Sequence, residues 1–212
     1  MGRKTNDESK NWSSRRRKRE RERRRREILE AGAKVFGRLG YSAATMELIA
    51  REAELGKASM YYYFKGKEDL YVAILEQGLK DLKKQFEDSG PLDAGNPADR
   101  LEAMLKGALD YFRKHRRELS LFLSLIASQG RGMGADTLRR ISKQFMEAHQ
   151  PFRKVLYDLD ELASTGGSIS DLVTTFMLGM GLKVAYRTGR KHGGGLEEQI
   201  GRFVSMLSRW MS

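Results

Sequence analysis

The residues best able to do chemistry stand close together in one short segment, which holds Lys57, Ser59, Tyr61 and Tyr62. Lysine and serine hydrogen-bond to base edges or phosphates, and tyrosine offers a ring to thymine methyl groups and a hydroxyl to phosphate oxygens. Three consecutive tyrosines cannot all point into the interior from a helix, and Tyr63 is the best placed of them for partial burial. At least two aromatic hydroxyls therefore face solvent or a partner, and the segment predicts a nucleic-acid contact surface.

Helical periodicity predicts the elements that position these side chains. Apolar residues over 28–39 follow one helical face, and Gly40 ends that helix as a C-terminal cap. A second helix is predicted over 46–53, a short third over 57–63, and a fourth from Lys67 to about Phe86. Two short helices joined by a tight turn and supported by a longer one form the helix-turn-helix arrangement.

Two further residues stand where a helix N-terminus favours an anion. Thr45 precedes the second predicted helix and caps it, and Lys67 begins the fourth. Free backbone N–H groups and the helix dipole already attract a phosphate at such positions. Thr45 and Lys67 are therefore candidates to hold the DNA backbone on either side of the reading helix.

The segment resembles the DNA-binding domain of the TetR family of bacterial transcriptional regulators. The likeness covers about 50 residues, a quarter of the chain, and is carried by Gly40-Tyr41, Ile49-Ala50, Ala53, the Tyr-Tyr-Phe run that ends at Phe64, and Lys67. The resemblance implies a repressor that binds a palindromic operator as a homodimer and is released by a small-molecule effector. It also implies base or backbone contacts from the DNA-binding residues Thr45, Gly56, Lys57, Ala58, Ser59, Tyr61, Tyr62, Tyr63 and Lys67, with Met60 and Phe64 in the core.

The chain departs from the family's pattern at four positions. Glu54 stands where the turn glycine is usual, Gly56 where a capping serine is usual, and Ala44 where threonine is common. Glycine in place of a capping serine costs only a few tenths of a kcal/mol, so we expect the third helix to form. Met46 replaces a base-reading arginine of some members, which argues against base contact from the second helix.

The net charge of +12 lies almost entirely in the first third of the chain. Residues 1–67 hold 19 Lys and Arg against 9 Asp and Glu, whereas residues 68–212 hold 21 against 19. A tract over 15–26 is basic except for Glu20 and Glu22, each placed four residues before an arginine for helical ion pairing. The tract is interpreted either as an arm that follows phosphates or a minor groove, or as a solvated end of the first helix.

Composition excludes several classes of protein. The absence of cysteine excludes disulfides and thiolate chemistry, and the three histidines, at 115, 149 and 192, show no metal-ligand spacing, so we expect neither a metal nor a cofactor. No apolar run is long enough to cross a membrane and no secretory signal is evident, so a cytosolic chain without a membrane partner is expected. An enzyme is disfavoured because no nucleophile, base and orienting group occur together. A constitutive DNA binder without an effector stays an alternative.

The expected fold is all-α. Residues 1–22 are predicted as a basic arm, disordered or partly helical, with no regular structure over 1–14; residues 23–70 as the helix-turn-helix domain; and residues 71–212 as a helical effector-binding and dimerisation domain. By composition, the Gly- and Pro-rich stretch at 88–97 is the best candidate for a domain boundary. Further helices are predicted over 98–114, 118–129, 135–162, 169–190 and 195–211, with a possible division of the third at Pro151.

The second domain offers two weaker signals. Met and aromatic side chains suit an adaptable cavity for a small apolar or amphipathic effector. The candidates, each of which also suits ordinary core packing, are Tyr111, Phe122, Leu125, Phe145, Met146, His149, Phe152, Tyr157 and Met177. Apolar stripes on the last two helices predict a four-helix homodimer interface, or else complete the protomer's own core. The interface candidates are Phe176, Met180, Phe203, Leu207 and Trp210.

Overall fold

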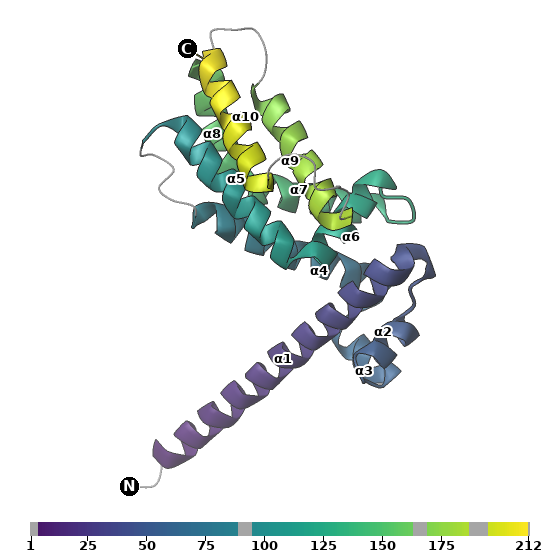
Figure 1. Cartoon of the computed structure of the whole chain (residues 1–212). Helices are drawn as coiled ribbons and strands as arrows, with labels where there is room; N and C mark the ends of the chain where they lie inside the picture. The colour runs from purple at the N-terminus through teal and green to yellow at the C-terminus, as the bar shows by residue number, and fades with distance from the viewer. Residues whose placement is uncertain (1–3, 89–94, 163–168, 187–194, 212) are drawn as a thin grey trace. The chain divides into compact units, whose positions relative to one another are not determined.

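The structure is a computed structural model that describes residues 4–88, 95–162, 169–186 and 195–211 (Figure 1). The side chains of residues 4–11, 13, 162, 186, 210 and 211 fall outside this description, among them that of the predicted interface residue Trp210, and so does His192. All regular structure in these ranges is helical, as predicted. The helices are α1 (Lys4–Ala43), α2 (Met46–Glu52), α3 (Lys57–Tyr63), α4 (Lys67–Glu87), α5 (Pro97–Lys114), α6 (Arg116–Ala127), α7 (Ala135–Ala148), α8 (Gln150–Leu162), α9 (Ile169–Tyr186) and α10 (Leu196–Met211).

The chain forms two compact units, a first unit of residues 1–74 and a second unit of residues 75–212. Their boundary lies inside α4 and not in the loop at 88–97. Each unit has its own apolar interior, and each is described separately below. No helix among the described residues is long and apolar enough to cross a membrane.

Helix α1 is much longer than the periodic segment 28–39 that predicted it. It begins at Lys4, so the prediction of no regular structure over residues 1–14 is wrong for residues 4–14. The predicted glycine break is confirmed, because Gly40 has a φ of 75° and one further turn follows it. A left-handed φ is strained for residues with a Cβ, which explains the glycine at this position.

The core of the first unit holds α1, α2, α3 and the start of α4 together. Ile28, Phe36, Ile49, Met60 and Leu70 are its fully buried large side chains. The ring of Phe36 packs edge-on against Tyr71 of α4, with centroids 5.0 Å apart. Burying side chains of this size contributes about 1.5–3 kcal/mol each, which is the main support for the short helices α2 and α3.

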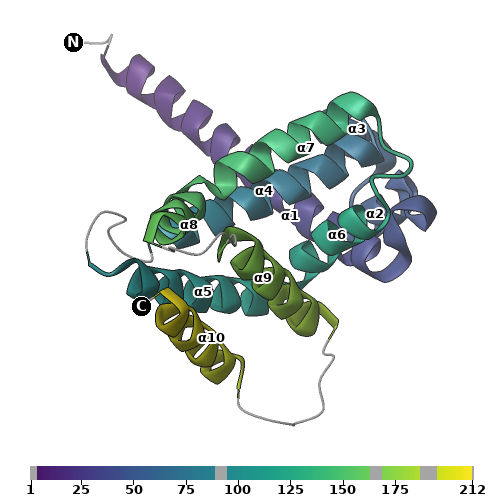
Figure 2. The same ribbon diagram turned by 90° about the horizontal axis from the view of Figure 1, so that it is seen from above.

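Helix α5 is the centre of the second unit and contacts α8, α9 and α10 (Figure 2). It is strongly amphipathic, and its buried face includes Leu101, Leu105 and Leu109. At its start Asn96 caps the helix by accepting a hydrogen bond from the Ala98 N–H at 2.9 Å, and proline at the first position suits the required φ.

The predicted helix over 135–162 is two helices. α7 ends at Ala148, His149 follows, and Pro151 lies in the first turn of α8, where its missing N–H breaks no helical hydrogen bond. The start of α9 is capped by a side chain of α8, since Asp160 accepts hydrogen bonds from the Ile169 N–H at 2.8 Å and the Ser170 N–H at 3.3 Å. An Arg100–Asp158 ion pair of 2.9 Å ties α5 to α8.

Candidate functional sites

Helix α3 separates buried anchors from an exposed face. Met60 and Phe64 are buried, as the resemblance implied. Tyr61 is 48% exposed and Tyr62 is 68% exposed, whereas Tyr63 is half-buried. Lys57, Ala58 and Ser59, in the first turn, are exposed as well. The helix therefore presents a lysine, a serine and two phenol groups to solvent on a scaffold that its own buried residues hold in place.

The turn between α2 and α3 forms without the usual glycine. Glu54 takes a φ of 54°, a left-handed conformation that costs a residue with a Cβ roughly 1 kcal/mol. The Leu55 N–H donates to the Ala50 carbonyl at 2.9 Å and closes the turn. Gly56 is the N-cap of α3 and supplies no side-chain hydrogen bond. Met46 is buried, so the second helix offers no base contact from that position.

Thr45 and Lys57 already have partners within the first unit. The Thr45 hydroxyl accepts a hydrogen bond from the Leu48 N–H at 3.2 Å, so its capping of α2 is confirmed. Lys57 forms an ion pair with Glu47, whose pKa is lowered by the hydrogen bond from the lysine ammonium. Both side chains are exposed, and water screens the pair. An exposed ion pair of this kind opens readily when a phosphate or a base competes for the lysine.

The position of Lys67 at a helix N-terminus predicted a free ammonium for a phosphate, but in the structure the ammonium binds backbone carbonyls. Its ammonium donates to the backbone carbonyls of Tyr41, Ser42 and Ala44 at 3.0, 3.2 and 3.1 Å. These three bonds use all three donors of the group. It also lies 4.7 Å from the centroid of the Tyr41 ring. The side chain thus caps the end of α1, and phosphate binding by the same ammonium would compete with those bonds.

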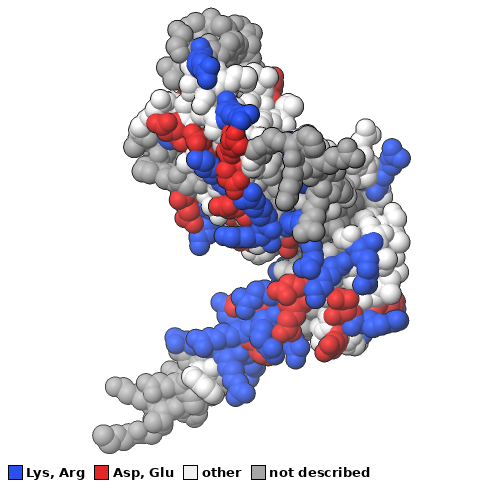
Figure 3. Space-filling model, in the orientation of Figure 1, with Lys and Arg blue, Asp and Glu red and all other residues white. Residues whose placement is uncertain are grey.

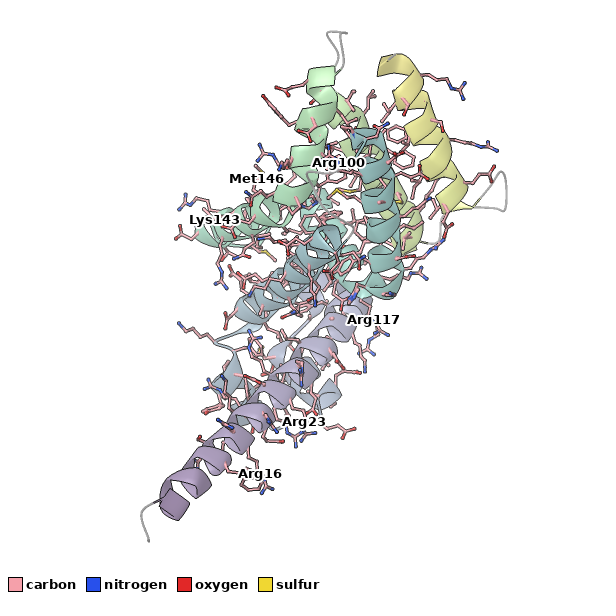
Figure 4. All side chains as sticks on the ribbon, turned by 90° about the vertical axis from the view of Figure 1, so that its left-hand side faces the viewer. Arg16, Arg23, Arg100, Arg117, Lys143 and Met146 are labelled. Atoms are coloured by element: carbon pink, nitrogen blue, oxygen red, sulfur yellow. The ribbon has the colours of Figure 1, made fainter. Side chains whose placement is uncertain are left out.

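The basic tract over 15–26 forms part of α1 (Figures 3 and 4). The predicted Glu20–Arg24 ion pair is present at 3.4 Å, and Arg23 also pairs with Glu20, at 2.7 Å. Within the described side chains, Glu22 and Arg26 form no ion pair. Five basic residues of the tract show neither an ion pair nor a ring contact with any described side chain. They are Arg15, Arg17, Lys18, Arg19 and Arg26.

Two arginines join the tract to the C-terminal half of the helix-turn-helix. The Arg21 guanidinium lies 5.5 Å from the centroid of the Tyr62 ring, and that of Arg25 lies 5.0 Å from the centroid of Phe64. Such contacts are attractive because the face of an aromatic ring is negative. Tyr62 is therefore within reach both of the tract and of a ligand at the exposed face of α3, so one surface includes the tract and α3.

We predict that Tyr61→Ala lowers affinity for a specific DNA duplex by roughly 10- to 100-fold while the protein stays folded. The expected loss corresponds to about 1–3 kcal/mol for a lost base contact, and an exposed side chain contributes little to the core. Affinity is measured by fluorescence anisotropy and the fold by circular dichroism. Met60→Ala is the matched contrast, because Met60 is fully buried one position away and its truncation costs about 2–5 kcal/mol of stability. An unfolded Tyr61→Ala protein would place Tyr61 in the core and overturn the assignment.

The second unit contains an open apolar cavity of about 210 Å³. Its wall comes from α4, α5, α6, α7 and α9. Of the residues proposed from the sequence, five line it: Tyr111, Phe122, Phe145, His149 and Met177. Three of its rings form one aromatic cluster, in which Phe145 stacks on Phe122 at 5.0 Å and lies 3.9 Å from His149 between centroids.

Four of the proposed cavity residues lie elsewhere. Phe152 is buried in the core, where it stacks on Phe86 at 5.4 Å, and Leu125 is buried on α6 outside the cavity wall. Met146 and Tyr157 are exposed, and Figure 4 shows Met146 on the outer side of its helix. Periodicity identified the apolar residues of these helices but could not tell which of them face a void.

The sequence interpretation missed most of the wall. The missed residues are Leu75, Gly78, Leu79, Leu82, Phe112, Glu118, Leu119, Leu123, Ile126, Thr174, Leu178 and Gly181. Gly78 matters because its carbonyl accepts a hydrogen bond from the Tyr111 hydroxyl at 2.6 Å, which fixes that ring at the wall. Burial raises the pKa of Tyr111, so the hydroxyl keeps the proton that it donates.

The predicted interface stripes are largely interior. Met180 and Leu207 are buried in the core of their own protomer, so their assignment to a subunit surface is wrong. The reason is that α5 and its neighbours take the most apolar side of both helices. Phe176 and Phe203 are only half-buried and stack on each other at 4.2 Å with nearly parallel rings. Leu172 and Leu182 of α9 and Met206 of α10 are exposed on the same two helices.

Comparison with known proteins agrees with the helix-turn-helix geometry of the first unit. Residues 28–74 match the model of bacterial regulatory proteins of the tetR family. An uncharacterized HTH-type transcriptional regulator of Bacillus subtilis, YhgD, is 32% identical over 96 residues, which are 45% of this chain and 49% of that protein. The transcriptional repressor NicS of Pseudomonas putida is 27% identical over 129 residues, 58% of each chain. The chain thus spans about half the length of these curated relatives.

Solved structures extend the likeness of the fold to both units. The structure of AibR in complex with isovaleryl coenzyme A and operator DNA superposes with a TM-score of 0.66 at 22% identity, covering 86% of this chain and 97% of that one. The exposed face of α3 and the turn before it define a helix-turn-helix domain, and the second unit has the helical fold of these structures. Residues 28–74 are thus a DNA-binding domain of the tetR family of bacterial regulatory proteins.

Proposed function

We propose that the protein is a transcriptional repressor that binds a palindromic operator as a homodimer and releases it when a small molecule occupies the cavity of the second unit. The observation that carries this proposal is the exposed face of α3, where Lys57, Ser59, Tyr61 and Tyr62 stand over buried anchors. In a helix-turn-helix the second helix enters the major groove with its N-terminal residues at the base edges. Lys57, Ala58 and Ser59 occupy that place, with Gly56 at the N-cap and Tyr61, Tyr62 and Tyr63 behind them.

Backbone contacts complete the proposed interface. Thr45 at the start of α2 and the N-terminus of α4 at Lys67 present helix N-termini to phosphates. Since the Lys67 ammonium caps α1, the contact that we propose from this position comes from backbone N–H groups of the first turn of α4. A small-molecule effector is supported by the apolar cavity and by AibR, whose structure holds both an acyl-coenzyme A and operator DNA.

The test of this function is enrichment of bound duplexes from a random pool at near-physiological salt. A palindrome with two half-sites is expected, and half-site centres about one helical turn of DNA apart would report the spacing of the two reading helices. A second candidate function, a non-specific DNA binder without effector, is favoured by the five basic residues of the tract over 15–26 that pair with no described carboxylate. Strong binding without any consensus would establish that second function and overturn the first.

We propose that the homodimer forms through one face of α9 and α10, defined by Leu172, Phe176, Gly179 and Leu182 together with Phe203 and Met206. These residues follow helical spacing on each helix, and the stacked pair Phe176 and Phe203 joins the two. A side chain at Gly179 would meet no atom within 4 Å, so a second α9 can approach the backbone closely there. Packing against its symmetry copy gives a four-helix interface.

Met206→Glu is predicted to convert the dimer to a monomer with an intact fold. Met206 is 52% exposed in the protomer, so a charge there harms only an interface that would bury it. Light scattering coupled to gel filtration measures the mass. Met146→Glu is the control, because Met146 is exposed on α7 to nearly the same extent and lies outside the proposed face. If Met206→Glu remains a dimer and Met146→Glu becomes a monomer, the proposed face is wrong and the interface includes α7.

A further inference from the structure

The cavity of the second unit is small, open and almost entirely apolar. Its volume is about 210 Å³, and a cavity of about 150 Å³ is known to hold benzene, so the space suits a molecule of about one or two rings. The described residues that line the cavity include no lysine and no arginine, and almost all of the surface that its wall exposes is apolar. The wall therefore offers no cation to an acid and few partners to any hydrogen-bonding group.

The two polar rings of the wall make their hydrogen bonds inside the protein. The Tyr111 hydroxyl donates to the Gly78 carbonyl at 2.6 Å. The Nδ1 of His149 lies 2.9 Å from the Phe145 carbonyl, which can only accept, so Nδ1 carries the hydrogen. Burial lowers the pKa of this imidazole, which is therefore neutral near pH 7. Both donors are thus used within the wall, and neither ring carries a charge.

Aromatic rings form a large part of the wall. They come from α5, α6 and α7 and belong to Tyr111, Phe112, Phe122, Phe145 and His149. The rings of Phe122 and Phe145 stack with 5.0 Å between centroids, and those of Tyr111 and Phe112 meet edge-on at 6.2 Å. A planar ligand can pack on such rings in the same two geometries, which adds to the gain from burying apolar area. A flexible chain of the same size would lose more conformational freedom on binding.

Two lining residues hold large apolar side chains in solvent. Ile126 of α6 is 50% exposed and Leu178 of α9 is 43% exposed. An apolar ligand in the cavity would cover part of both side chains. Removal of apolar surface from water is the main source of affinity at a site without polar partners.

We propose that this cavity binds a compact, uncharged aromatic molecule through apolar contacts alone. The proposal rests on the effector-binding function proposed above and names the class of ligand. A polar group carried into the cavity would give up its hydrogen bonds to water and find no partner, so each such group lowers affinity. An anionic group would lose more, because no lysine or arginine is among the described lining residues. Glu118 also lines the wall, but since so little of the exposed surface is polar, we expect no ion pair with a ligand there.

Three probes of the same shape test the absence of hydrogen bonds: indene, indole and benzimidazole. Indole has an N–H where indene has a methylene group, and benzimidazole has one further ring nitrogen. Titration calorimetry on the full chain near pH 7 is expected to give indene about 10-fold tighter binding than indole, and indole about 10-fold tighter binding than benzimidazole. A fourth probe, 2-aminoindane, carries a positive charge on a body of similar size and is expected to bind about 100-fold more weakly than indene.

Gly181 allows the site to be located. A Cβ at this position would lie 3.5 Å from Leu119 Cδ1 and 3.8 Å from Phe112 Cε2, which are ordinary contacts with two other lining residues. In Gly181→Leu the new side chain is expected to fill part of the cavity and to lower indene affinity by at least about 10-fold. Gly37→Leu is the matched control, because Gly37 is an exposed helical glycine of the first unit where a Cβ would meet no atom within 4 Å. If circular dichroism shows Gly181→Leu to be unfolded, Gly181→Ala replaces it, with an expected loss of about threefold.

Each other outcome contradicts the proposal in a way that the repressor function can survive. Equal or tighter binding of indole or benzimidazole would overturn the inference, because a group of the wall would then bond the nitrogen. Tighter binding of 2-aminoindane, no binding of indene, or an indene affinity unchanged by the substitution at Gly181 would overturn it as well. Operator binding is measured with indene present. If indene binds as expected and operator affinity stays the same, effector release is refuted and the ligand class stands.

Discussion

Replacing Arg15, Arg17, Lys18, Arg19 and Arg26 by glutamine is expected to lower operator affinity by about 100- to 1000-fold near 0.15 M salt and to flatten its salt dependence. Each phosphate contact contributes about 0.9 to the slope of log affinity against log salt, so the loss of five contacts reduces that slope by about 4 to 5. These five side chains are exposed and pair with no described carboxylate, so their charges are available to a polyanion.

Geometry supports this large effect. Twelve residues of helix extend about 18 Å at 1.5 Å per residue, and duplex DNA carries one phosphate charge per about 1.7 Å of its axis. The tract over 15–26 therefore runs beside about as many phosphates as it has basic residues. Its cation–π contact with Tyr62 links this charged helix to the exposed face of α3, so that in the proposed complex one surface would contact both the backbone and the bases.

The control variant has the same net charge as the variant with five neutralised residues in the tract. It neutralises five exposed basic residues of the second unit, which are Lys106, Arg139, Lys143, Arg153 and Lys154. Affinity is measured by anisotropy at several salt concentrations for both proteins. A slope that is the same in the arm variant and in the wild type would show that the tract is only a solvated helix end. An equal loss in both variants would show that overall charge, and not the arm, controls binding.

The sequence predicted the reading helix well because its signals are local. The family resemblance placed Met60 and Phe64 in the core, and helical geometry left at least two of the three tyrosines between them outside, as the structure shows. The helix break at Gly40 could be predicted for the same reason, since the type of a single residue determines whether a left-handed φ is sterically allowed. Pro151 likewise marked the break between α7 and α8 from its own chemistry.

The cavity and the surface of α9 and α10 could not be predicted in the same way. Leu79 and Leu82 are apolar residues on a helix, and only the packing of α5, α6 and α9 around α4 decides that Leu79 and Leu82 line a void. Glu118 looks like an acid that stabilises the first turn of its helix, and its place at the cavity wall depends on Gly78, forty residues away. Met180 and Leu207 were assigned to a partner because a helical stripe does not reveal whether its contacts lie in the same chain.

Lys67→Met is expected to lower the free energy of unfolding by about 2–3 kcal/mol. The variant keeps an apolar stem of similar length and removes three hydrogen bonds from an ammonium to the carbonyls of Tyr41, Ser42 and Ala44. Hydrogen bonds to charged groups contribute about 1.5–3 kcal/mol each, and partial exposure to water reduces the sum. The cation also lies at the C-terminal end of α1, where the helix dipole favours positive charge.

Urea unfolding followed by circular dichroism measures this loss, with Lys65→Met as the control at an exposed lysine two positions away. The same two variants decide between the two roles of Lys67. If its ammonium serves the fold, Lys67→Met shifts the unfolding midpoint, and the salt slope of operator binding by the folded protein stays the same. If it instead binds a phosphate, stability is unchanged and the slope falls by about 0.9. In that case the contact that the sequence predicted for Lys67 would stand, and water would donate the hydrogen bonds to the three carbonyls.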